Sequence, residues 1–163
     1  MTSTTTTLPS SKNAFSTIAI AGILAGTLDG LAAIILAYFR SGVKPELIFK
    51  YIASGYFGPE AFKGGTEMVV WGVFFHYLIA TSWAIFIYLI YPKVIGLLKN
   101  KYVVGIIAGI VVWFVMNLIV VPSSKVPPAK SFDITQVLIN MAILIIAVGI
   151  PISMVIDARR SPK

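Results

Sequence analysis

The stretch YVVGIIAGIVVWFVMNLIVV, residues 102–121, decides the fold of this chain. It contains no charged side chain, and a helix of about 20 residues extends about 30 Å, which is the thickness of the hydrocarbon core of a bilayer. Of the 163 residues in the chain, 58% are hydrophobic and only 12% are charged, whereas soluble domains carry about 25% charged residues. The sequence therefore predicts a membrane protein.

Three further apolar stretches are long enough to span a bilayer, and Asp29 is the only Asp, Glu, Lys or Arg in any of them. Their apolar residues are continuous, without the alternation that is typical of transmembrane β-strands, so we expect helices. We predict an all-α membrane protein with four transmembrane helices, at about residues 17–39, 68–91, 102–121 and 134–156.

The N-terminal region does not have the pattern of a cleaved signal peptide. Signal peptides contain an apolar region of about 7 to 15 residues, whereas the first apolar stretch is longer and includes Asp29. The residues before it are rich in threonine and serine and offer too little apolar surface to offset the entropy cost of ordering. We therefore predict a disordered tail at residues 1–13 and a single transmembrane domain at residues 14–163.

The long loop after the first span has the signals of a helix. Pro45 suits a first helical turn, Glu46 follows it, and Gly55 suits a helix end. The apolar and polar residues between them fall on opposite faces, as in helices that lie on a membrane surface. We predict a short interfacial helix at about residues 45–54, acting either as a strap over the helix ends or as a lid over a binding site.

Glycines recur every fourth residue in two of the predicted spans. Gly22, Gly26 and Gly30 share one face of the first span, and Gly105 and Gly109 share one face of the third. In lipid, small residues at this spacing let two helix backbones approach closely. We predict that these faces pack against other helices, either within one chain or, for the first span, in a homo-oligomer.

Five Asp, His, Asn or Gln residues lie inside the predicted spans, where each needs a partner or a water-filled space. They are Asp29, His76, Asn117, Gln136 and Asn140. At about 1.5 Å of helix rise per residue, all five fall in the half of the membrane away from the chain termini. We predict a polar pocket that opens on that side, with Asp29 and His76 as its central pair.

Three functions are compatible with this pocket. It could bind a small ligand or a proton, as in an accessory membrane protein. It could instead serve a small membrane enzyme or lipid-modifying accessory protein that uses Asp29 and His76 beneath the predicted lid. The polar residues could also be packing hydrogen bonds in a structural scaffold. We favour the first function, which needs no catalytic residue.

Several chemistries are excluded. The chain has no cysteine and one histidine, which rules out thiolate metal sites and bis-histidine haem ligation within one chain. It has no nucleotide-binding, zinc-protease or serine-hydrolase motif in a suitable context. We expect neither a metal nor another cofactor.

The net charge of +7 comes from basic residues spread over several segments. No single basic face would suit a nucleic acid, so none is expected as a partner. Basic residues lie close to the helix ends in the second loop and the C-terminal tail, which favours both termini in the cytoplasm. Anionic headgroups attract such a basic collar, so membrane lipids are the expected partners.

Residues 72–77, GVFFHY, carry a resemblance to a known family, together with Tyr91-Pro92, Asn117 and the proline-rich stretch at 122–128. These features are similar to those of the YagU-like family of uncharacterised bacterial inner-membrane proteins. The resemblance covers about the second and third spans and the general four-span plan. It implies a multi-pass protein of the bacterial inner membrane, and it implies no reaction.

Overall fold

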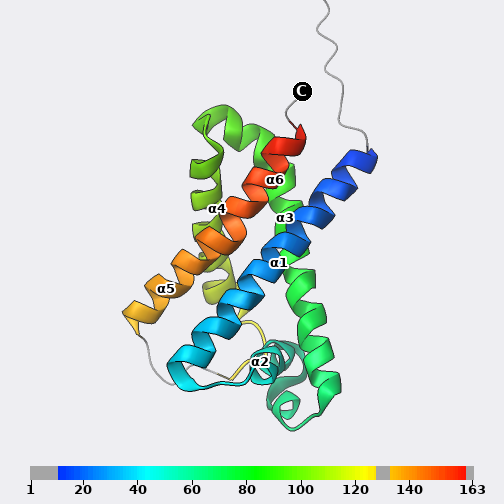
Figure 1. Ribbon diagram of the computed structural model, residues 1–163, viewed down its shortest axis with the longest axis vertical. Coiled ribbons are helices and arrows are strands. Elements are labelled where there is room, and N and C mark those ends of the chain that lie inside the picture. Colours follow the sequence, from blue (N-terminus) through cyan, green and yellow to red (C-terminus); the bar gives the residue numbers. More distant parts are fainter. Residues whose placement is uncertain (1–10, 128–132, 161–163) are drawn as a thin grey trace, which may run out of the picture.

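The computed structural model describes residues 11–127 and 133–160, and these are almost entirely helical, with no described residue in a β-strand. The chain begins and ends its helices at the same end of the bundle (Figure 1). The long elements are α1 (Ser11–Ser41), α3 (Thr66–Leu98), α4 (Lys101–Val115) with the π-helical turn η2 (Met116–Val120), and a last helix made of α5 (Ile134–Leu144), the π-helical turn η3 (Ile145–Gly149) and α6 (Ile150–Arg160).

These helices confirm the four predicted spans. The segments that are long and apolar enough to cross a membrane are Ala14–Ser41, Thr66–Leu98, Lys101–Val120 and Ile134–Arg160. The second span is longer than predicted because α3 continues through Pro92 and ends before Lys99, whose φ of 54° is left-handed. A proline removes one helical hydrogen bond, and here the helix continues in spite of that loss. Residues 11–13 of the predicted tail belong to α1, and the rest of the tail lies outside the described residues.

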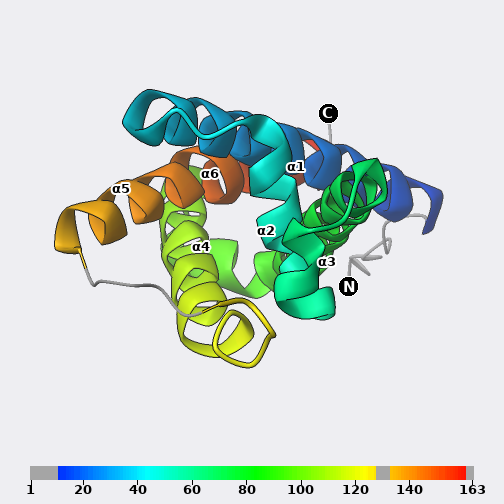
Figure 2. The ribbon, with the colours of Figure 1, turned by 90° about the horizontal axis from the view of Figure 1, so that it is seen from below.

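A helix occupies the predicted place in the first loop. α2 (Pro45–Phe57) packs against α3, across the end of the bundle opposite the termini (Figure 2), and leads into the short 3₁₀-helix η1 (Gly58–Phe62). Gly72 of α3 makes this packing possible, because a Cβ at that position would overlap the carbonyl oxygen of Phe49. The position of α2 at a membrane interface stays a prediction.

The glycine face of α1 packs against α3. In order along the face, Gly22, Gly26 and Gly30 lie against Thr81, Tyr77 and His76. A Cβ at Gly26 would approach the Tyr77 ring to 2.9 Å, which is closer than real Cβ atoms come. α3 of the same chain therefore covers this face.

The glycine face of α4 packs against the last helix. A Cβ on Gly109 would overlap the backbone of Ile145, and one on Gly105 would lie 2.7 Å from the Cα of Ile150. Gly149 lies between these contacts and approaches the backbone of both glycines. Three glycines thus let α4 and the last helix approach backbone to backbone, as small residues do in membrane bundles.

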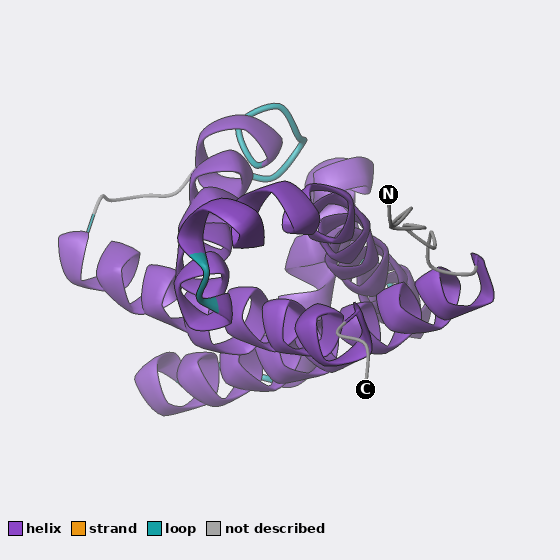
Figure 3. Cartoon of the chain, turned by 90° about the horizontal axis from the view of Figure 1, so that it is seen from above, coloured by secondary structure: helices purple, strands orange, loops and turns teal. Residues whose placement is uncertain are grey.

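The main cluster of buried apolar side chains joins α1, α3, α4 and α6, and Figure 3 views the bundle from the end at which both termini lie. Ala21, Ala25, Ala84, Ile152 and Ile156 are all fully buried there. Large apolar side chains elsewhere point outward, as expected of helices that face lipid. The half of the bundle near α2 has less of this core, and the cavities described below lie in it.

Candidate functional site

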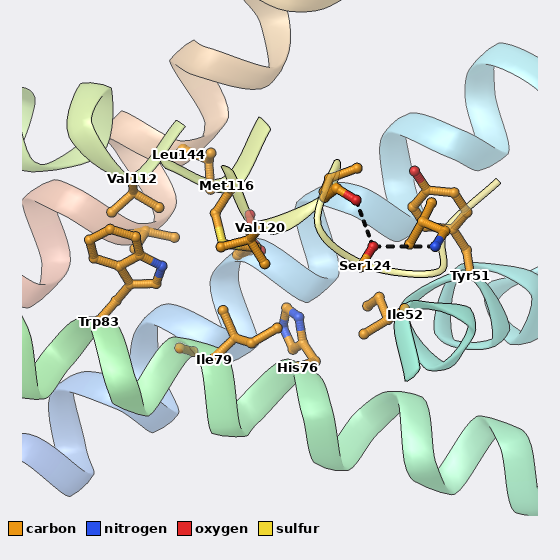
Figure 4. Close-up of a pocket in the computed structure, with 16 residues that line it drawn as sticks. Tyr51, Ile52, His76, Ile79, Trp83, Val112, Met116, Val120, Ser124 and Leu144 are labelled. Carbon is orange, nitrogen blue, oxygen red and sulfur yellow. Dashed lines mark hydrogen bonds between the residues drawn. The ribbon is translucent and has the colours of Figure 1, made fainter. Parts of the chain in front are cut away.

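A cavity of about 250 Å³ lies in the half of the bundle near α2. All the long helices and α2 contribute to its wall, which is mostly apolar and includes the ring of Trp83 (Figure 4). Its other polar side chains are Asp29, Tyr51, His76 and Ser124. The structure thus brings Asp29 and His76 to one cavity, here called the Asp29 cavity, although apolar groups dominate its surface.

His76 is held by a hydrogen bond to the backbone of α1. Its Nε2 lies 2.7 Å from the carbonyl oxygen of Gly26. A carbonyl oxygen only accepts hydrogen bonds, so Nε2 carries the hydrogen, and Nδ1 of the neutral imidazole is left as an acceptor. Gly30 gives the ring its room, because a Cβ there would be only 3.2 Å from Nε2.

Asp29 is half-buried on α1 and contributes to the same wall. Its carboxylate accepts no hydrogen bond from the described residues. A carboxylate offers only acceptors when it is ionised. With Asp29 ionised and His76 neutral, the Asp29 cavity presents two acceptors in mostly apolar surroundings, the Asp29 carboxylate and the His76 Nδ1.

The three predicted amide residues lie elsewhere. Asn117, Gln136 and Asn140 line a second cavity of about 920 Å³, here called the amide cavity, with Arg40 and Asp133 also in its wall. The five predicted pocket residues are thus divided between two cavities. These are neighbours, because both are lined by Tyr51, Val121 and Val126.

Hydrogen bonds use part of the capacity of the three amides. The Gln136 Nε2 donates to the Asn140 Oδ1 at 2.5 Å, one turn further along α5. The Asn117 Nδ2 donates to the carbonyl oxygen of Trp113 at 2.9 Å, within its own helix. Neither bond joins two helices, so these amides do not act as interhelical links among the described residues.

Tyr51 of α2 lies between the two cavities. Burial raises the pKa of the Tyr51 phenol above its ordinary value. The hydroxyl group is already neutral at physiological pH with its ordinary pKa, and it can both donate and accept a hydrogen bond.

A polar cluster at the other end of the bundle was not predicted. The Tyr91 hydroxyl donates to the Asp157 Oδ1 at 3.0 Å, and the Lys101 Nζ donates to the Asp157 Oδ2 at 3.2 Å. The Ser153 Oγ donates to the carbonyl oxygen of Lys101 at 2.7 Å. Asp157 and Lys101 mark the edges of two predicted spans at the same membrane surface, and this is the signal that could have paired them.

Within the described residues, no group of three or more His, Asp and Glu side chains is arranged to hold a metal ion. No family model, curated protein or solved structure is significantly similar to this chain. The evidence for function is therefore the geometry of the two cavities.

Proposed function

We propose that this small multi-pass membrane protein binds a small, mostly apolar ligand in the Asp29 cavity, and that the ligand carries a hydrogen-bond donor. The observation that supports this most is the pairing of two acceptors, the Asp29 carboxylate and the His76 Nδ1, in one mainly apolar cavity of about 250 Å³. Ligand sites usually combine an apolar wall with a few convergent polar groups. A proton is the smallest occupant that the same two acceptors would take.

The two acceptors also select the polar functional group of the ligand. An amine or a hydroxyl group can donate to Asp29 and His76, whereas a carboxylate would place acceptor against acceptor. The ring of Trp83 in the wall adds a favourable surface for a cationic head. Amines are therefore the preferred class, with alcohols second.

α2 serves this cavity as a fixed strap in our proposal. It contributes Tyr51, Ile52 and Gly55 to the wall. The backbone of Phe49 meets Gly72 too closely for a side chain to fit between them, and a contact of this kind favours a docked helix over a mobile lid. This favours the binding function over an enzyme that opens and closes by moving its first loop.

The family and location of the protein belong to the same proposal. The resemblance of residues 72–77 to the YagU-like family supports a place in the bacterial inner membrane. The basic residues where α3 meets α4 and in the last turn of α6 support cytoplasmic termini. The cavities would then lie in the outer half of the membrane.

The experiment compares three probes of similar size in the full chain, reconstituted in lipid nanodiscs: 2-phenylethylamine, 2-phenylethanol and 3-phenylpropionate. Trp83 reports binding by fluorescence when Trp71 and Trp113 are replaced by Phe. We expect the amine to bind most tightly, the alcohol more weakly and the carboxylate least. Asp29→Asn should weaken amine binding about tenfold or more, because hydrogen bonds to charged groups contribute about 1.5–3 kcal/mol.

The control variant is Glu60→Gln, which removes an exposed acid outside the cavity. It should bind all three probes as the wild type does. Equal amine affinity in wild type and Asp29→Asn would contradict the proposal, and so would tighter binding of the carboxylate than of the amine.

A further inference from the structure

The amide cavity lies beside the Asp29 cavity and is lined by a different set of polar side chains. Its described charged side chains are one base and one acid. Among the described residues, the charged side chains in its wall are Arg40 and Asp133, whose Nη2 and Oδ2 atoms lie 3.8 Å apart. The opposite charges offset each other. An anionic or cationic ligand would therefore find no uncompensated charge among the described residues of this wall to neutralise its own.

The amides offer both donors and acceptors. After the bonds that Gln136 and Asn117 donate, the Gln136 Oε1, the Asn117 Oδ1 and the Asn140 Nδ2 have no partner among the described residues. Exchanging the oxygen and nitrogen of any of these side chains would still leave a mixture of donors and acceptors. Hydroxyl and amide groups, which themselves donate and accept, are the chemical match for such a wall.

The cavity also opens toward the surface that faces lipid. Leu118 contributes to its wall and is 62% exposed, and the next residue along the helix, Ile119, is 58% exposed. Arg40 and Asp133 lie at the ends of α1 and α5, where a headgroup region would meet the helices. The side of the cavity formed by Leu118 is therefore continuous with exposed apolar surface. The side formed by Arg40 and Asp133 lies at helix ends, at the depth expected for lipid headgroups.

We propose that the amide cavity binds the uncharged, hydroxyl- or amide-bearing head of a membrane amphiphile, whose hydrocarbon chain lies on the apolar surface beside Leu118. The proposal does not depend on what occupies the Asp29 cavity.

The test measures the affinity of the full chain in a zwitterionic detergent for 1-monooleoylglycerol, by native mass spectrometry. Oleate and oleylamine are the charged comparators with the same hydrocarbon chain, and free glycerol is the headgroup without the chain. We expect 1-monooleoylglycerol to bind at least tenfold more tightly than either charged amphiphile, and free glycerol not to compete at millimolar concentration.

The matched variant is Gln136→Met/Asn140→Leu, which keeps the side-chain sizes and removes the hydrogen bonds. It should weaken 1-monooleoylglycerol binding about tenfold or more, because the hydrogen bonds to the headgroup are lost, and leave oleate binding unchanged. Leu138→Ala, on the exposed side of the same helix, should bind like the wild type, and Asn117→Leu provides a second test if the double variant does not fold. Unchanged 1-monooleoylglycerol affinity in the folded amide variants, equal or tighter binding of oleate, or full competition by free glycerol would each overturn the proposal.

Discussion

The Nε2 of His76 on α3 donates a hydrogen bond to the carbonyl oxygen of Gly26 on α1, 2.7 Å away. This contact fixes the tautomer of the imidazole and leaves its Nδ1 as an acceptor. The glycine repeat of α1 makes this contact possible, because Gly30 leaves space beside the imidazole ring. One hydrogen bond thus links helix packing to the chemistry of the Asp29 cavity.

Replacing His76 by leucine should lower stability modestly. His76→Leu loses the bond to Gly26, and interhelical hydrogen bonds in membranes contribute about 0.6 to 2 kcal/mol. The measurement is the melting temperature in detergent. His76→Gln, which keeps a side-chain donor, should recover part of the loss, and a larger loss in His76→Gln than in His76→Leu would contradict this role.

Replacing Asp29 by leucine should leave the protein at least as stable as the wild type. The carboxylate accepts no hydrogen bond from the described residues, and an acid at membrane depth costs about 2.5–3.5 kcal/mol on insertion scales. Thermal unfolding of Asp29→Leu in detergent tests this expectation. A clear fall in melting temperature would mean that Asp29 supports the fold through His76, which is the scaffold function.

Replacing Gly72 by alanine should separate α2 from α3. The new methyl group would overlap the carbonyl oxygen of Phe49, and backbone atoms cannot move aside as a flexible side chain can. We expect a loss of about 1–3 kcal/mol, the usual cost of overpacking, together with faster proteolysis of the first loop. Gly96→Ala is the matched control, because no atom lies within 4 Å of its added Cβ, and it should be neutral or slightly stabilising.

Replacing Tyr91 by phenylalanine should weaken the cluster around Asp157. Tyr91 is 2% exposed and donates to the Asp157 Oδ1, so Tyr91→Phe should cost about 1 to 2 kcal/mol in unfolding free energy. Tyr38→Phe, at a position that is 61% exposed, should change stability by less than about 0.5 kcal/mol. Equal melting temperatures for the two variants would show that the buried bond adds nothing to stability.

The spans and the helix of the first loop could be predicted because each depends on local sequence. A charge-free stretch such as residues 102–121 is long enough to cross a bilayer wherever the rest of the chain lies. The charge-free stretch before Lys93 places the end of the second span at about residue 91, whereas α3 continues through Pro92 to Leu98, because one missing hydrogen bond does not end a helix.

The pairing of side chains across helices could not be predicted in the same way. Depth along a helix is proportional to residue number, so Asp29 and His76 could be placed at similar levels. The direction in which each helix faces its neighbours cannot be obtained from residue number in this way. For this reason the sequence grouped Asn117 and Asn140 with Asp29, whereas the structure places these two amides in the amide cavity.

The sequence by itself determined that the chain forms long apolar helices, how many of them there are, and which polar residues lie within them. Hydropathy and length are sums over neighbouring residues, and no tertiary contact can change them. Only the tertiary structure decided that Gly26 receives the His76 hydrogen bond, that α3 covers the glycine face of α1, and that the polar residues form two sites. Those relationships depend on helix rotation and crossing, which are set by packing between segments far apart in the chain.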